Sequence, residues 1–263
     1  GSWGGEQRVV LRVHPYDLRA LLARDAAPRR VAPALLPWLG ERERGPSLRP
    51  LAAAAPPSPA ELVFLERRVA GPLVAGAQGD ALKVAGRMAG LVDHALWDLE
   101  RCGAGPCRAL VEARWPSAAG WGLLVVGGGD SGLVIEAPQA AGEPGSGRLA
   151  AELFAASAGR ALVIGGGGVG LGAYAPIQAL HQAAVAVPPT LVLQIRGLAA
   201  RPGAALVIGL GRPAQGLALP PVLADMLTAD GALGWVPAWR LADGSPELAA
   251  LAGAGNPQLE FAA

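Results

Sequence analysis

Three polar residues in the second half of the chain have the chemistry and the positions expected of a ligand site. Gln139 and Glu143 lie in VIEAPQAAGEPGSG, residues 134–147, which reads as the end of a buried strand, a loop, and a helix opening at Ser146. Loops between a strand and a helix are where α/β proteins usually bind ligands. Arg196 follows a later apolar strand, TLVLQIRG. These side chains either belong to a metal-dependent active site or form an ion pair without catalysis.

A glycine-rich loop offers a different chemistry. Gly165, Gly167 and Gly170 satisfy G-x-G-x-x-G between a predicted strand and a predicted helix, the arrangement that binds a dinucleotide pyrophosphate. The fingerprint also needs an acidic residue at the end of the next strand, where this chain has Gln194 and Arg196. An arginine there could meet the 2′-phosphate of NADP. Because a run of four glycines in a glycine-rich chain satisfies many patterns, dinucleotide binding is the alternative hypothesis.

Other reactive residue types are explained better by structure. The tetrapeptide GDSG, residues 129–132, surrounds the nucleophile of chymotrypsin-like serine proteases, but a hairpin turn accounts for the same letters. His14, His94 and His181 do not have metal-ligand spacing and are interpreted as hydrogen-bonded structural residues, His181 on a helix face that packs on the sheet. His181 is in addition a candidate binding residue beside Gln139, Glu143 and Arg196. The seven tryptophans are interpreted as packing residues.

The two cysteines, Cys102 and Cys107, lie in the loop ERCGAGPCRAL. In an exported protein they could form a disulfide, and in a reducing compartment they would be two thiols. The disulfide is favoured because the chain has no other cysteine. A metal site is excluded, since one C-x4-C pair supplies too few ligands.

The composition limits the possible partners. Charged residues make up 16% of the 263 residues, against about 25% in an ordinary globular domain, with 38 glycines and 24 prolines. The net charge is +1 and no basic stripe carries interleaved aromatics, which argues against nucleic-acid binding. Residues 161–195 carry no Asp, Glu, Lys or Arg, but glycines and prolines interrupt them before a membrane-spanning helix is reached. In the opening GSWGG, the residues Gly1 and Ser2 read as a cloning remnant, so a natural export signal could have been removed. The compartment is therefore not determined, with export slightly favoured.

The pattern of elements predicts an N-terminal extension with a linker, residues 1–58, and a single α/β domain, residues 59–263. In the extension, residues 17–28 are a helix candidate, and Ser58 is expected to cap the next helix. Residues 79–101 place an apolar stripe at helical spacing and predict a helix that includes His94. Strands are expected at 108–115, 120–126 and 131–137, the last two joined as a hairpin.

The rest of the chain alternates strands and helices. Ser146 and Gly159 are expected to cap a helix between them. The further expected strands lie at 161–165, 190–197, 204–211 and 234–241, and the helices at 175–186 and 220–230. Short apolar strands separated by such helices predict a mixed, largely parallel central sheet with helices on both faces.

Residues 108–262 carry, in order, the motifs GWGLLVV, LVIEAPQAAGEPGSGRLAAELF, RALVIGG, IQALHQAA, TLVLQIRG and LAGAGNPQLEF. In this order they resemble the zinc-dependent amidohydrolases and peptidases of the poly-gamma-glutamate hydrolase and N-formylglutamate amidohydrolase type, on a carboxypeptidase-like α/β fold. The resemblance covers rather more than half the chain. It implies zinc held by a histidine after the proline of the first strand, a carboxylate a few residues on, and the histidine of an H-G pair after a later strand.

Those three positions fall on Gln139, Glu143 and Arg196. An arginine cannot be a zinc ligand, because its guanidinium stays protonated. The resemblance therefore implies a protein without metal or cofactor, in which Arg196 and Glu143 pair instead. The expected function is a catalytically inactive, hydrolase-like protein that binds a protein partner or serves in an assembly, in the cell envelope. The alternatives are an active zinc hydrolase with other ligands and a dinucleotide-binding enzyme.

Overall fold

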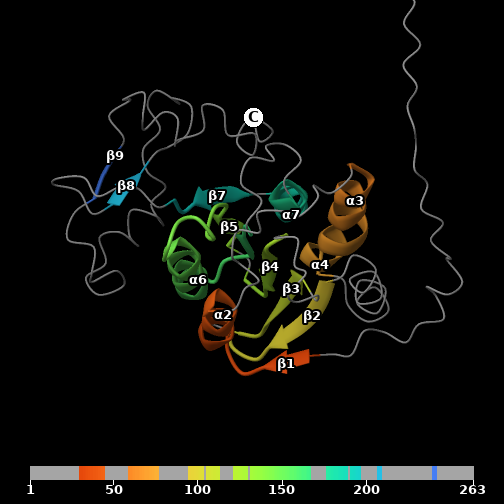
Figure 1. The fold of residues 1–263 in the computed structure, drawn as a ribbon, viewed down its shortest axis with the longest axis horizontal. Coiled ribbons are helices and arrows are strands. Elements are labelled where there is room, and N and C mark those ends of the chain that lie inside the picture. The colour runs from red at the N-terminus through yellow and green to blue at the C-terminus, as the bar shows by residue number, and fades with distance from the viewer. Residues whose placement is uncertain are drawn as a thin grey trace, which may run out of the picture.

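The computed structural model describes residues 30–44, 59–76, 94–103, 105–112, 121–129, 131–166, 176–188, 190–196, 206–208 and 239–241. Their main feature is a seven-stranded mixed sheet with helices on both faces, which confirms the predicted α/β class (Figure 1). The strands are β1 (Arg30–Ala32), β2 (His94–Leu99), β3 (Cys107–Glu112), β4 (Leu123–Gly127), β5 (Leu133–Ala137), β6 (Ala161–Ile164) and β7 (Leu191–Gln194). The helices are α2 (Leu35–Arg44), α3 (Pro59–Phe64), η2 (Leu65–Ala70), α4 (Gly71–Val74), α6 (Ser146–Ser157) and α7 (Pro176–Val185). β8 (Leu206–Ile208) and β9 (Trp239–Leu241) form a separate parallel pair.

The strand order is β1-β2-β3-β4-β6-β5-β7. β5 is parallel to both β6 and β7, and β1 is parallel to β2, whereas the pairings β2–β3, β3–β4 and β4–β6 are antiparallel. The helix α6 connects β5 to β6, and α7 connects β6 to β7 on the far side of β5. The carboxyl ends of β5, β6 and β7 therefore share one edge of the sheet.

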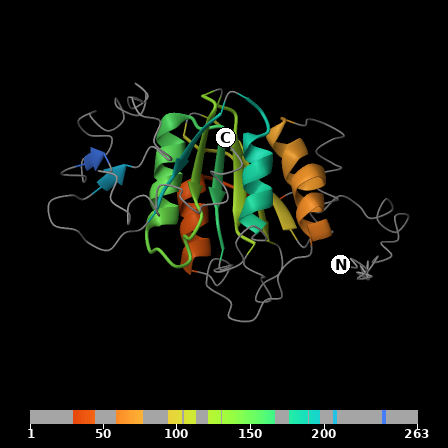
Figure 2. The same ribbon diagram turned by 90° about the horizontal axis from the view of Figure 1, so that it is seen from above.

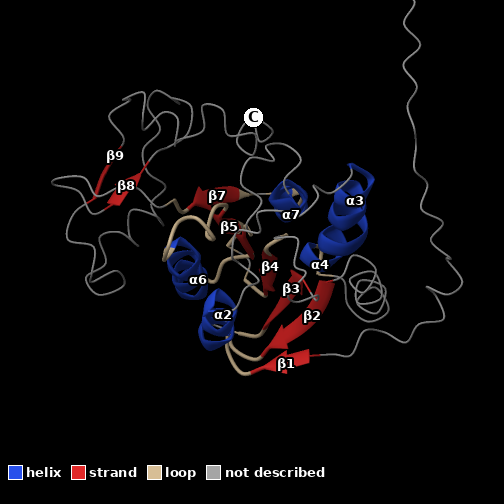
Figure 3. Ribbon diagram, in the orientation of Figure 1, coloured by secondary structure: helices blue, strands red, loops and turns tan. Residues whose placement is uncertain are grey.

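Helices cover both faces of the sheet (Figures 2 and 3), and each face has its own core. On one face, α2 and α6 pack through Leu35, Leu39 and Phe154. On the other face, η2, α4 and α7 pack through residues such as Leu65 and Leu180. β5 and β6 are buried along their whole length, as strands covered on both faces must be. No helix in the described part of the chain is long and apolar enough to cross a membrane.

The predicted helix at 79–101 is wrong for residues 94–99, which form β2. Trp97 and Leu99 contact the core on the α2 face, while Leu96 contacts the core on the α7 face. This is the period of two of a strand. The apolar residues of this short stretch match both periods, and pairing with β1 and β3 decides between them.

The predicted hairpin between residues 120–126 and 131–137 is also wrong. β4 and β5 do not pair with each other, because β6 lies between them, antiparallel to β4 and parallel to β5. The expected caps of α6 are displaced as well. Gly145 occupies the N-cap and Ala158 the C-cap, and the Ser146 hydroxyl donates backward to the Glu143 carbonyl oxygen instead of capping the helix.

Part of the predicted extension belongs to the main body. β1 is an edge strand of the large sheet, and α2 supplies buried side chains to one core. The domain boundary at residue 58 stays a prediction. The helices expected at 17–28 and 220–230, and the Ser58 cap, lie outside the described residues.

Candidate functional site at the carboxyl ends of β5 and β7

Two polar clusters lie where β5 and β7 end. In the sheet register Glu136 of β5 stands opposite Gln194 of β7, and the Ile195 backbone N–H donates to the Glu136 carbonyl oxygen at 2.7 Å. Arg196 comes two residues after Gln194, so the end of β7 and the residues just beyond it carry an amide and a guanidinium. Side chains at the carboxyl ends of parallel strands are where α/β sheets commonly bind ligands.

The inner cluster is a buried carboxylate with two partners. Glu136 and His181 are both completely buried, and His181 Nδ1 lies 2.6 Å from Glu136 Oε1. The Gln194 side-chain amide donates to Glu136 Oε2 at 3.0 Å. A buried charge is tolerated only when it is paired or hydrogen-bonded, and here each carboxylate oxygen has a partner. The cluster fastens α7 to β5 and β7.

His181 keeps one ring nitrogen without a hydrogen-bond partner in the described structure. Nδ1 faces Glu136, and the other nitrogen, Nε2, is buried without a partner. In the neutral tautomer whose Nδ1–H donates to Glu136, Nε2 carries the lone pair of the ring. A carboxylate that orients an imidazole in this way is common at metal and acid–base sites. The complete burial of His181 separates this ring from solvent in the described structure.

The outer cluster is the ion pair between Arg196 and Glu143. The Arg196 Nε lies 3.0 Å from Glu143 Oε1 and 3.3 Å from Oε2, and Nη2 lies 3.0 Å from Oε1. The side chains are 20% and 12% exposed, so the pair is largely shielded from water. The ion pair predicted between these residues is present.

The backbone of residues 139–146 places Glu143. The amides of Gly142 and Glu143 donate to the Gln139 carbonyl oxygen, at 2.8 and 2.9 Å, and the Ser146 amide donates to the Glu143 carbonyl oxygen at 3.1 Å. Gln139 therefore contributes its carbonyl group to the turn, while its side chain is exposed. Of the residues singled out in the sequence, the structure brings together Glu143 and Arg196, and it places His181 in the inner cluster.

These residues do not suit the zinc that the resemblance implies. A guanidinium 3.0 Å from the Glu143 carboxylate brings positive charge to the place of a dication, and a glutamine amide is a poor zinc ligand. In the described part of the chain no group of three or more His, Cys, Asp or Glu side chains could hold a metal ion.

The glycine fingerprint is partly explained by packing. The Gly165 amide donates to the Ala137 carbonyl oxygen at 2.9 Å, and a Cβ atom on Gly165 would lie 2.0 Å from the Pro138 carbonyl oxygen. The end of β6 therefore needs a glycine to pass the chain that leaves β5. Gly167 and Gly170 lie outside the described residues.

The serine of GDSG holds a turn. The Ser131 hydroxyl donates to the Ala158 carbonyl oxygen at 3.0 Å and accepts from the Leu133 amide at 3.3 Å. His94 lies on β2 and packs edge-to-face against Trp121, with ring centroids 5.5 Å apart. Both observations agree with structural roles.

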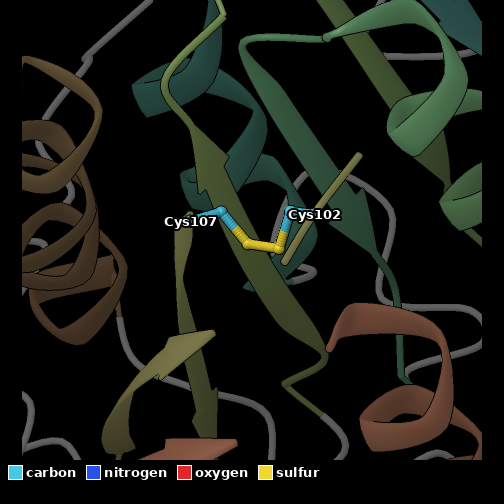
Figure 4. Close-up of a disulfide and its surroundings, with 2 residues drawn as sticks. All are labelled: Cys102 and Cys107. Atoms are coloured by element: carbon cyan, nitrogen blue, oxygen red, sulfur yellow. A yellow bond between two sulfur atoms is a disulfide. The ribbon is translucent and has the colours of Figure 1, made fainter. Parts of the chain in front are cut away.

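Cys102 and Cys107 form a disulfide, the pairing that the sequence favoured (Figure 4). It closes the turn between β2 and β3 on the face covered by α2 and α6. Both sulfur-bearing side chains are buried.

Glu136 and Gln194 are functional candidates that the sequence reasoning missed. Glu136 is the one charged residue in the buried strand LVIEA, and an isolated charge in such a strand signals a buried partner. The partner itself depends on the register of β5 with β7 and on the docking of α7, which the sequence pattern does not specify.

The chain matches no protein-family model, no curated protein sequence and no solved structure. The resemblance to zinc amidohydrolases and peptidases therefore stays a prediction. The functional argument depends on the geometry of the two clusters.

Proposed function

We propose that this protein is a catalytically inactive, hydrolase-like α/β protein that acts as a binding or structural component, in the cell envelope. The observation that carries the proposal is the Arg196–Glu143 ion pair. It occupies the positions to which the resemblance assigns zinc ligands, and it replaces the charge of a metal with that of a guanidinium. The loop after β5 can then stay ordered without a metal.

The proposed binding surface consists of Gln139, Glu143 and Arg196. We call it the cleft rim, because the resemblance implies an active-site cleft at these positions. Glu143 accepts from Arg196 Nε and Nη2, and within the described residues the N–H groups of Nη1 remain available to a partner. The exposed Gln139 amide adds a donor and an acceptor on the same loop. The disulfide supports the proposed location in the cell envelope, since disulfides persist mainly in exported proteins.

Metal analysis tests the absence of catalysis. We expect the chain, purified without chelator and then offered zinc, to hold no stoichiometric zinc. The double variant Gln139→His/Arg196→His restores the implied ligand set with Glu143 and should hold about one zinc per chain. The matched control, Gln139→Ala/Arg196→Ala, removes the guanidinium without adding ligands and should hold none. One zinc per unmodified chain would overturn the proposal, and failure of the histidine variant to bind zinc would remove the mapping on which it depends.

Binding at the cleft rim is tested with the same alanine variant. The immobilised unmodified chain is incubated with an envelope extract of the source organism, in parallel with Gln139→Ala/Arg196→Ala. We expect a protein that the unmodified chain retains and the variant loses. Equal retention by both would place the binding surface elsewhere.

A further inference from the structure

A cluster of tryptophan and arginine side chains lies at the opposite end of the strand order, on β1, β2 and α2. The Arg42 guanidinium lies 4.0 Å from the ring centre of Trp38 and 4.5 Å from that of Trp97. Arg30 also lies over the Trp97 ring, 5.6 Å from its centre. The two indoles meet edge-to-face with centroids 6.0 Å apart.

The positive charges of this cluster are not balanced by an ion pair in the described structure. Arg42 donates to the Trp38 carbonyl oxygen at 3.2 Å, and both arginines otherwise contact indole faces. The pKa of the Arg42 guanidinium is lowered to about 10, mainly by burial, while the charge of Glu41 raises it and the charge of Arg30 lowers it to a smaller extent. Arg42 is still charged at neutral pH, in partly desolvated surroundings where an anion would be attracted strongly.

The indole N–H groups of the same cluster lack acceptors. Among the described residues, Trp38 Nε1 and Trp97 Nε1 are both buried without a hydrogen-bond partner, and Trp38 is only 3% exposed. A buried donor without an acceptor is costly, and a neighbouring ring face is a weaker partner than an oxygen. Two guanidinium groups and two indole donors thus lie together with one backbone carbonyl oxygen as their acceptor.

We infer that Trp38, Trp97, Arg42 and Arg30 form a binding site for an oxyanion, a carboxylate or a phosphate group. Its oxygens would accept from the indole N–H groups and from the free edge of the Arg42 guanidinium, and its charge would offset the arginines. The planar guanidinium suits such groups because it can donate two parallel hydrogen bonds. This site is distinct from the cleft rim, which lies at the β7 end of the strand order.

Indole N–H resonances of the full-length, ¹⁵N-tryptophan-labelled protein give a direct test. The protein is titrated in separate arms with potassium phosphate and with potassium acetate, against potassium chloride at equal ionic strength. Trp38→Phe and Trp97→Phe assign the two resonances, and each removes one N–H while it keeps an aromatic ring. We expect a saturable downfield shift of these two signals in at least one arm, and the arm that responds identifies phosphate or carboxylate as the preferred ligand.

Two variants make the result specific. Arg42→Met should weaken the binding at least about tenfold, as expected for loss of one charge-assisted contact. Trp121→Phe, in the core on the opposite face, should leave the affinity unchanged. The inference is overturned if neither anion shifts the two signals beyond the chloride arm. Equal affinity in Arg42→Met and in the unmodified protein would overturn it as well.

Discussion

At the scale of single residues, two glutamates near the end of β5 carry different kinds of partner. Glu136 is completely buried and is held by neutral or titratable donors, His181 and Gln194. Glu143 is largely buried and is held by a permanent cation, Arg196. The first glutamate should matter most for stability and the second for the shape of the cleft rim.

Replacement of Glu136 should be among the more destabilising changes in the protein. Glu136→Ala leaves the His181 Nδ1 and the Gln194 amide without their acceptor in the core, which should cost about 3 kcal/mol of unfolding free energy. Glu136→Gln keeps an acceptor and should cost less. Urea denaturation measures the difference. Arg148→Ala, which breaks an exposed ion pair with Glu152, is the control and should change stability by less than about 0.5 kcal/mol.

The Arg196–Glu143 pair should show measurable coupling. A double-mutant cycle with Arg196→Met and Glu143→Gln should give about 1 kcal/mol of interaction free energy, since the pair is shielded and held by two guanidinium nitrogens. Arg196→Lys should lose most of that coupling, because a lysine cannot make the same forked contact. Additive single effects, with no coupling in urea denaturation, would contradict the structure.

At the scale of elements, the turn between β2 and β3 contacts three other elements, β1, α2 and α6. The disulfide closes this turn. Its backbone is hydrogen-bonded to α2 and β1: the Leu35 amide donates to the Arg101 carbonyl oxygen at 2.9 Å, and the Glu100 amide donates to the Ala32 carbonyl oxygen at 3.0 Å. The turn also touches α6, since a Cβ on Gly103 would lie 1.9 Å from the Ala155 carbonyl oxygen. The disulfide therefore secures the junction of β1, α2 and α6.

Removal of the disulfide should lower the melting temperature without abolishing the fold. A loop of this length should lose about 2 kcal/mol, which corresponds to about 6 °C in a domain of this size. We expect a thiol reductant to lower the melting temperature of the unmodified protein to that of Cys102→Ala/Cys107→Ala, and to leave the variant unchanged. Equal melting temperatures with and without reductant in the unmodified protein would show that the bridge does not contribute.

The elements also show which parts of the fold the sequence could predict. The central residues of β3 to β7, α6 and α7 could be predicted from apolar runs and flanking turn residues. A buried strand or helix shows its apolar pattern within its own few residues, so no contact with a distant segment is needed to recognise it. The strand order does not, since β6 enters between β4 and β5 through contacts between distant segments. Likewise the Arg196–Glu143 pair followed from matched positions, whereas Glu136 and Gln194 needed the register of β5 and β7.

At the scale of the whole molecule, the sheet is stabilised by a separate core on each face, and the N-terminal part of the chain supplies one of them. Leu35 and Leu39 of α2 are each 1% exposed and pack in the core that also holds Phe154 of α6. β1 completes the edge of the sheet beside β2. The fold thus depends on residues that the sequence pattern assigned to an extension.

A chain that starts at residue 59 should therefore not reach the stability of the full chain. It lacks β1 and α2, so the apolar side chains beneath them are exposed to water, and each fully buried leucine lost removes about 2 kcal/mol or more of burial. We expect a lower urea midpoint and binding of a hydrophobic dye by the shortened chain. Within the full chain, Leu39→Ala should cost about 3 kcal/mol. Its neighbour Leu36, which is 41% exposed, is the matched control, and Leu36→Ala should cost less than about 1 kcal/mol. Equal midpoints for the full and shortened chains would instead establish residues 59–263 as an independent domain, with α2 an accessory layer.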